Sequence, residues 1–156
     1  MDGFHYSKEQ LLLFPNSTEA FARRGAHWTF NGTAFVEKLT RLKETGSGLF
    51  PSFSHGTGNP VEDSIAVNFD QHKTVIVEGN YLLLDIEPWN AVRSILDFVF
   101  FIEADIQTIR QRIYGRHMSL GYGEEVSLRR TLTNDLPNAE LVLSTKNRAD
   151  IIITSN

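Results

Sequence analysis

The sequence contains no cysteine among its 156 residues. Disulfides, thiol catalysis and cysteine-ligated zinc or iron–sulfur centres are therefore excluded. No stretch approaches the roughly 18 consecutive apolar residues that a membrane-spanning helix needs, and no apolar run follows a basic segment near Met1. We therefore expect a cytoplasmic protein without a membrane partner.

Clustered charge is missing as well. The formal net charge is −4, and acidic and basic residues alternate along the chain. Nucleic-acid binders usually concentrate lysine and arginine on one face, so nucleic acid is not an expected partner. The five histidines show no paired spacing such as H-x-x-x-H, which argues against a zinc site.

The sequence does contain enough apolar residues for a core, and its length favours one globular domain over residues 1–156. Three segments are short, continuously apolar, and rich in β-branched or aromatic residues. These segments are Thr74 to Glu78, Phe98 to Ile102 and Asp150 to Thr154. Such runs are typical of strands in a parallel sheet that is covered on both faces.

Helical spacing of apolar residues occurs between and before these strands. One set is Phe35, Leu39 and Leu42; another is Ile106, Ile109 and Ile113, with Asp105 as the expected N-cap. Leu128 and Leu132, then Leu141 and Leu143 beyond Pro137, predict two more short helices. Strands that alternate with helices predict an α/β fold, a three-layer sandwich with a mainly parallel sheet.

Two stretches break this regularity and are predicted to be loops. Thr45 to Asp63 is rich in glycine, serine and proline, and Gly115 to Glu125 carries three glycines around Arg116 and His117.

Glu78 follows an apolar strand and precedes Gly79. Ligands of open α/β sheets gather at the carboxyl ends of strands, so this carboxylate could hold Mg²⁺ beside a phosphate. A cap or a salt-bridge partner is the alternative interpretation.

Asp2, His5 and Tyr6 place a carboxylate, an imidazole and a phenol close together. An aspartate can accept the proton of an attacking hydroxyl in phosphoryl transfer, while histidine or tyrosine holds the acceptor. A solvated terminal tail would explain the same residues.

Arginines and polar-aromatic loops supply the remaining candidates. Arg110, Arg112 and Arg116 could close over polyphosphate, although a solvated helix face explains the first two equally well. The segments Arg23 to Phe30 and Pro51 to His55 mix cations, histidines and aromatics, and could form either a pocket for a polar metabolite or plain surface loops.

Together these motifs resemble the superfamily of uridine kinase, pantothenate kinase and phosphoribulokinase, in particular its uridine-kinase-like branch. The resemblance spans nearly the whole chain and rests on the order of several motifs. These are MDGFHYS, RRGAHWTFN, PSFSH followed by NPVED, VIVEGNYLLLD, DFVFFIE, RQRIYGRH, and NDLPNAELV before RADIII.

The resemblance implies a P-loop kinase fold that uses ATP and Mg²⁺ to phosphorylate a small metabolite. It implies that Asp2 is the catalytic base, that Glu78 lies near the metal, and that Arg112 and Arg116 belong to a lid over ATP. The residues it implies for the acceptor pocket are His5, Tyr6, Arg24, His27, Phe53 and His55. Relatives commonly carry proline at the position of His27 and aspartate at that of Ser54, so the acceptor stays open between nucleoside, pantothenate-like acid and sugar.

The family's phosphate-binding loop is absent, because no G-x-x-x-x-G-K-[ST] occurs in the sequence. In the family this loop follows a central first strand, upstream of the segment that resembles MDGFHY. We therefore expect a chain that lacks the first strand, folds poorly alone because neighbouring strands lose backbone partners, and is inactive as it stands. A noncatalytic kinase-like protein that binds a metabolite or a partner is the alternative. The sequence predicts no oligomeric state.

Overall fold

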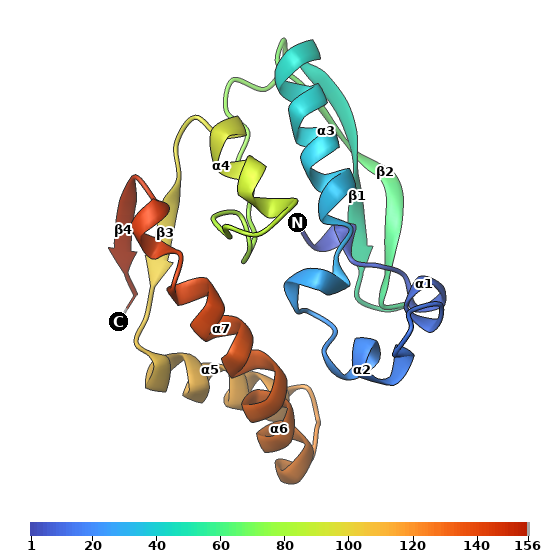
Figure 1. Cartoon of the computed structure of the whole chain (residues 1–156), viewed down its shortest axis with the longest axis vertical. Helices are drawn as coiled ribbons and strands as arrows, with labels where there is room; N and C mark the ends of the chain where they lie inside the picture. The colour runs from blue at the N-terminus through green and yellow to red at the C-terminus, as the bar shows by residue number, and fades with distance from the viewer. Residues whose placement is uncertain (156) are drawn as a thin grey trace. The chain divides into compact units, whose positions relative to one another are not determined.

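A computed structural model describes residues 1–155. The chain forms two compact units, Met1–Asp97 and a second unit that begins at Phe98, and each is described by itself (Figure 1). The elements of the first unit are η1 (Asp2–Phe4), α1 (Lys8–Leu12), α2 (Ser17–Ala22), η2 (His27–Thr29), α3 (Gly32–Thr45), β1 (Ser47–Ser54), β2 (Asn59–Asn68), η3 (Trp89–Ala91) and α4 (Val92–Ile95).

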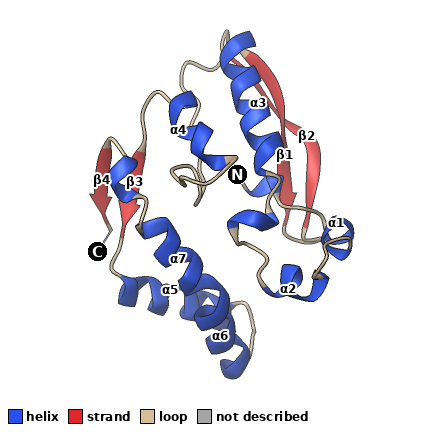
Figure 2. Ribbon diagram, viewed as in Figure 1, coloured by secondary structure: helices blue, strands red, loops and turns tan. Residues whose placement is uncertain are grey.

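The second unit alternates strand, helices and strand (Figure 2). Its elements are β3 (Phe100–Glu103), α5 (Ile106–Ser119), α6 (Glu124–Arg130), the π-helical turn η4 (Thr131–Asp135), α7 (Leu136–Leu143), η5 (Lys146–Arg148) and β4 (Ile151–Thr154). None of the helices in residues 1–155 has the length and apolar character needed to cross a membrane.

The two long helices lie where the apolar spacing predicts helices. The Asn31 side chain caps α3 by accepting from the backbone N–H of Ala34, and Gly46 ends this helix with a φ of 73°. Asp105 caps α5 by accepting from the backbone N–H groups of Gln107 and Thr108, as expected. The apolar spacing therefore located both helices, and the predicted cap also located the start of α5.

Thr45 to Asp63, which we expected to be a loop, is mostly a β-hairpin, so this prediction is wrong. β1 and β2 pair antiparallel from Ser47 opposite Asn68 to Ser54 opposite Asn59, and the register shifts between Phe50 and Ser52. The shift surrounds Pro51, which has no N–H to donate to a ladder. The loop composition thus reflects an irregular hairpin that packs against α3.

β3 and β4 pair in parallel, from Phe100 opposite Ile151 to Glu103 opposite Thr154, which confirms two of the three expected strands. The predicted strand at Thr74 to Glu78 is wrong, because this segment pairs with no strand in the described part of the chain.

The predicted burial of these three segments is also wrong. Ile76 is 89% exposed and Ile102 is 72% exposed. A parallel strand is buried only when neighbouring strands and both layers cover it, and the sheets described have two strands each. The structure therefore mixes helix and strand as expected, but with small sheets.

The core of the first unit is aromatic. The Trp89 ring, which is 2% exposed, contacts Phe30, Phe35 and Tyr81 with centroids 6.2, 5.6 and 5.8 Å apart. Leucines surround this cluster. The buried ones are Leu11, Leu39, Leu42, Leu82, Leu83 and Leu84. Trp89 thus joins segments that are far apart in sequence.

The second unit has a different interior. α5 and α7 contain no fully buried residue, and the buried residues of α6 and η4 are Ser127, Thr131 and Asn134. The expected loop Gly115 to Glu125 is wrong over most of its length, since Gly115 to Ser119 completes α5 and α6 starts at Glu124. The fully buried residues of these helices are therefore polar.

Replacing Trp89 by alanine should lower the unfolding free energy of the first unit by about 3–5 kcal/mol, because a large buried aromatic leaves a cavity that its neighbours fill only partly. The matched control is Phe100→Ala, since Phe100 is 59% exposed and its truncation should cost far less. Urea unfolding followed by circular dichroism measures both. Equal losses in the two variants would contradict the placement of Trp89 in the core.

Candidate functional site

Asp2 and Glu78 lie beside each other in the first unit. The Met1 amino group donates to the Glu78 carbonyl oxygen at 2.6 Å, and both side-chain carboxylates are close enough to act electrostatically on that amino group. Gly79 allows this approach, because a Cβ there would lie 2.4 Å from the Met1 sulfur. Both carboxylate-bearing residues are exposed to solvent.

The short turn that carries Asp2 is held by backbone contacts on both sides. The N–H of Asn31 donates to the Phe4 carbonyl at 2.7 Å, and the N–H of Tyr6 donates to the Thr29 carbonyl at 3.0 Å. Gly3 lies against β1 so closely that a Cβ would be 2.0 Å from the Pro51 oxygen. Asp2 therefore stands on a fixed backbone rather than on a solvated tail.

Next to Asp2, aromatic and cationic side chains gather in a cluster. His5 lies between Phe30 and Phe53, with ring centroids 3.9 and 4.9 Å away. The Arg24 guanidinium lies over the Phe53 ring at 5.6 Å and donates to the Tyr6 carbonyl at 2.9 Å. The five acceptor candidates that the structure brings together here, hereafter the acceptor cluster, are His5, Tyr6, Arg24, Phe53 and His55, the last stacked edge-on to Phe53 at 5.3 Å.

His27 is connected to this cluster only through core rings. Its imidazole contacts the Tyr81 ring at 5.9 Å, and Tyr81 contacts Phe30 at 5.8 Å. The Tyr81 hydroxyl donates to the Gly25 carbonyl at 2.6 Å, which fixes the turn that precedes His27. Tyr81 is a positioning residue that sequence reasoning missed; its place three residues after Glu78 was the available signal.

Burial controls the ionisation of the cluster. Desolvation lowers the pKa of His5, and the Arg24 charge lowers it further by a smaller amount. The hydrogen bond to the Asp2 carbonyl acts in the opposite direction and raises this pKa. Desolvation also lowers the pKa of His27, and Arg23 adds to that effect. His5 Nδ1 lies 2.8 Å from the Asp2 carbonyl oxygen, which can only accept. In the neutral ring Nδ1 therefore carries the proton, and Nε2 is the acceptor.

Arg112 and Arg116 belong to α5 of the second unit. They are four residues apart and therefore share one helix face. The Arg112 guanidinium donates to the Ser155 hydroxyl at 3.1 Å, while Arg116 is exposed. Arg110, two residues before Arg112, is also exposed.

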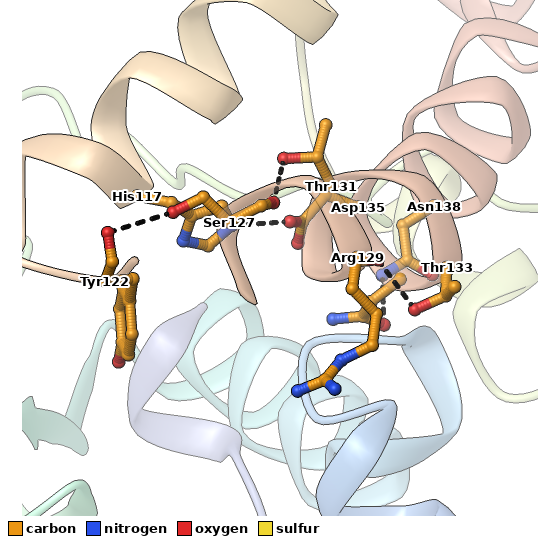
Figure 3. A network of polar contacts seen from close by, with 9 residues as sticks. His117, Tyr122, Ser127, Arg129, Thr131, Thr133, Asp135 and Asn138 are labelled. Carbon is orange, nitrogen blue, oxygen red and sulfur yellow. Dashed lines mark hydrogen bonds and ion pairs between the residues drawn. The ribbon is translucent and has the colours of Figure 1, made fainter. Parts of the chain in front are cut away.

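A network of polar contacts occupies the helices of the same unit (Figure 3). His117 Nε2 and Asp135 Oδ2 are 2.7 Å apart and connect α5 to η4. The Ser127 hydroxyl donates to the Tyr122 carbonyl at 3.3 Å, and the Thr131 hydroxyl donates to the Ser127 carbonyl at 2.8 Å. Sequence reasoning noted His117 only as the neighbour of Arg116, and it missed Asp135.

A separate hollow of about 590 Å³ lies between α3 and the β1–β2 hairpin. It is lined by Lys38, Arg41, Phe50 and Asp63 among others, and Lys38 forms an ion pair with Asp63 at 3.1 Å. None of the site residues expected from the sequence lines it.

Comparison with known proteins gives consistent relatives. No protein-family model matches the chain. It is 38% identical over 157 residues to the Schizosaccharomyces pombe "Putative uridine kinase C227.14", covering 98% of this chain and 66% of that protein. It is 33% identical over 158 residues to the "ATP-dependent kinase-like protein notR'" of Aspergillus versicolor, covering 97% of this chain and 90% of that protein.

Two solved structures are similar throughout the chain. A "putative fructose transport system kinase" from Silicibacter sp. TM1040 superposes with a TM-score of 0.87 at 26% identity, over 97% of this chain and 71% of that one. YFH7 from Saccharomyces cerevisiae, described as "a putative P-loop containing kinase with a circular permutation", superposes with a TM-score of 0.84 at 25% identity, over 99% of this chain and 56% of that one.

The pKa of His5 makes the stability of the first unit depend on pH. Because burial lowers this pKa below its ordinary value of 6.5, the unfolded chain binds more protons than the folded chain as the pH falls through that value. The unfolding free energy should therefore be full above about pH 7 and should decrease toward pH 5.5.

Urea titrations between these two pH values measure this dependence, and His5→Gln should make it shallower. Phe53→Leu is the control, since it removes a ring contact of His5 without removing a titratable group, so the pH dependence should remain. An unchanged pH dependence in His5→Gln would contradict a proton-linked role for this imidazole.

Proposed function

Because the chain belongs to the family of P-loop kinase-like proteins, we propose that it binds the acceptor and carries the catalytic base of an ATP-dependent kinase that phosphorylates a hydroxyl of a small metabolite. The observation that carries the proposal is the position of Asp2. This exposed carboxylate stands on a fixed turn whose neighbouring Met1 contacts Glu78 and whose own carbonyl contacts His5 of the acceptor cluster. The acceptor stays open between a nucleoside, a pantothenate-like acid and a sugar.

The proposed chemistry needs few groups. Asp2 accepts the proton of the acceptor hydroxyl, and the oxygen of that hydroxyl forms a bond to the γ-phosphorus of ATP. The bond between this phosphorus and the departing ADP breaks. Neutral His5 offers Nε2 as an acceptor for another hydroxyl of the substrate, and the rings of Phe53 and Tyr6 supply apolar walls. Arg112 and Arg116, which the family resemblance implies for a lid over ATP, carry guanidinium groups that match phosphate oxygens.

Magnesium fits this arrangement of oxygen ligands. The described residues contain no group of three or more side chains that could hold a metal, yet Mg²⁺ needs only one or two carboxylates when phosphates and waters complete its shell. Glu78, beside Asp2, would supply such a carboxylate. The ion would neutralise charge on the phosphates of ATP.

The phosphate cradle is the part that these residues do not supply. A G-x-x-x-x-G-K-[ST] loop is absent from the 156 residues, and positioning and charge neutralisation provide nearly all of the catalysis in phosphoryl transfer. The kinase proposed here therefore includes a phosphate-binding loop outside them. The same absence favours a second candidate, a noncatalytic kinase-like protein that binds the metabolite.

One experiment separates these candidates. The 156-residue chain and a version extended at Met1 by an apolar strand and a G-x-x-x-x-G-K-[ST] loop are assayed with MgATP and a panel of nucleosides, pantothenate-like hydroxy acids and sugars. We expect no turnover by the short chain and acceptor-dependent ADP release by the extended one. In the extended chain Asp2→Asn should lower kcat by about 10²–10⁴, the usual contribution of a general base.

The control for Asp2→Asn is Asp70→Asn, which neutralises an exposed carboxylate in the turn after β2 and should leave turnover unchanged. If the extended version binds an acceptor but never releases ADP, the result would support the noncatalytic candidate. Full activity in Asp2→Asn would remove the assigned base.

A further inference from the structure

The interior of the helices in the second unit is built from hydrogen-bonding groups. Here the helical arm is defined as α5, α6, η4 and α7, residues 106–143. Its fully buried side chains are Ser127, Thr131 and Asn134, and the apolar residues buried in this unit, Val99, Phe101 and Ala104, lie in or beside β3. Apolar residues of the arm such as Ile109, Ile113 and Leu141 are only half-buried. The fully buried contacts of the arm are therefore those of polar side chains.

Most polar contacts of the arm are local. The hydroxyls of Thr131 and Thr133 donate to backbone carbonyls four residues earlier in the same helical run, and the Ser127 hydroxyl donates to the Tyr122 carbonyl just before α6. The contact between His117 and Asp135 is different, because it spans 18 residues and joins α5 to the π-helical turn between α6 and α7 (Figure 3). It therefore ties two helical segments to each other, which the local contacts do not.

The His117–Asp135 contact is well protected from water. The two side chains are 12% and 26% exposed, their atoms are 2.7 Å apart, and the Tyr122 ring lies edge-on to the imidazole at 5.8 Å. Nδ1 of His117 is buried and has no hydrogen-bond partner among the described residues. The carboxylate therefore is the group that orients the imidazole, with the proton on Nε2.

This orientation extends to the arginines. His117 directly follows Arg116, and Arg112 lies on the same face as Arg116 one turn earlier. Because successive helical residues are related by a fixed rotation, holding His117 toward Asp135 sets the direction in which both arginines leave α5. Both arginines lie on the exposed side of the helix.

We infer that His117 and Asp135 form a clasp that fixes the helical arm and thereby positions Arg112 and Arg116. They are positioning residues, since neither is assigned a contact with the reacting groups. The value of this positioning for catalysis rests on the proposed function. The clasp itself is a property of the 156-residue chain and is tested without nucleotide.

The absence of cysteine allows a direct measurement. Spin labels at Gln111→Cys on α5 and Glu140→Cys on α7, both at exposed positions, report the distance between the two helices. We expect a narrow distance distribution in the chain with the clasp intact and a broad one in Asp135→Ala. Asp135→Asn should restore the narrow distribution, because its amide oxygen still accepts from Nε2–H.

Amide hydrogen exchange measures the same opening in the unlabelled chain. Exchange at the end of α5, from Arg116 to Leu120, should be about tenfold or more faster in Asp135→Ala, the factor that a hydrogen bond to a charged group typically contributes. The matched control is Ser144→Ala, which removes a local hydrogen bond to the Leu141 carbonyl and should leave exchange in α5 unchanged.

His117→Leu removes the donor from the other side of the clasp while keeping an apolar side chain of similar size, and it replaces Asp135→Ala if that variant loses its helical circular dichroism. A narrow distribution and unchanged exchange in both variants would overturn the clasp. A broad distribution in Asp135→Asn would overturn the role assigned to the hydrogen bond. These results are independent of the kinase assay. An extended chain without kinase activity, together with the expected broadening in the 156-residue chain, would refute the proposed function and leave the clasp standing.

Discussion

The packing of Trp89 against Phe30, Phe35 and Tyr81 is the constraint on which the first unit depends. Two of these rings, Phe30 and Tyr81, also contact candidate site residues. Phe30 carries the ring stack of His5, and Tyr81 contacts His27 and follows Glu78 by three residues. The site is thus an extension of the core to the surface, which explains how short turns without regular secondary structure can hold functional groups in place.

Close backbone approach is the second element of this design. Gly3 against Pro51 and Gly79 against Met1 bring main chains nearer than a side chain would permit. Since catalytic groups must be held to a fraction of an ångström to be effective, a carboxylate on such a turn is better placed than one on a flexible terminus. The glycines next to Asp2 and Glu78 therefore have a physical reason to be there.

The two units bury different kinds of side chain. The first buries large rings, whose contribution is mostly non-directional. The helices of the second unit bury hydroxyls and an amide, whose contribution depends on geometry and is lost when a partner moves. Apolar side chains of that unit are meanwhile exposed on the β3–β4 sheet, where Phe98 and Phe100 contact each other with centroids 4.9 Å apart.

Local signals in the sequence located the two long helices. Asp105 caps α5, and the spacing of Phe35, Leu39 and Leu42 defines α3, because both features act within one or two helical turns. The motifs around Asp2 and Glu78 likewise pointed to the kinase family that the relatives identify. The strand at Thr74 to Glu78 was wrong for the opposite reason, since an apolar run becomes a strand only where another strand supplies backbone partners.

By itself, then, the sequence determined the two long helices, the family and the residue types of the site. Only the tertiary structure decided that Met1 contacts Glu78, that five of the six acceptor candidates share one cluster, and that His117 meets Asp135. The contacts Met1–Glu78 and His117–Asp135 join residues 77 and 18 positions apart. Such pairings depend on how whole elements pack, and no local pattern of residues encodes them.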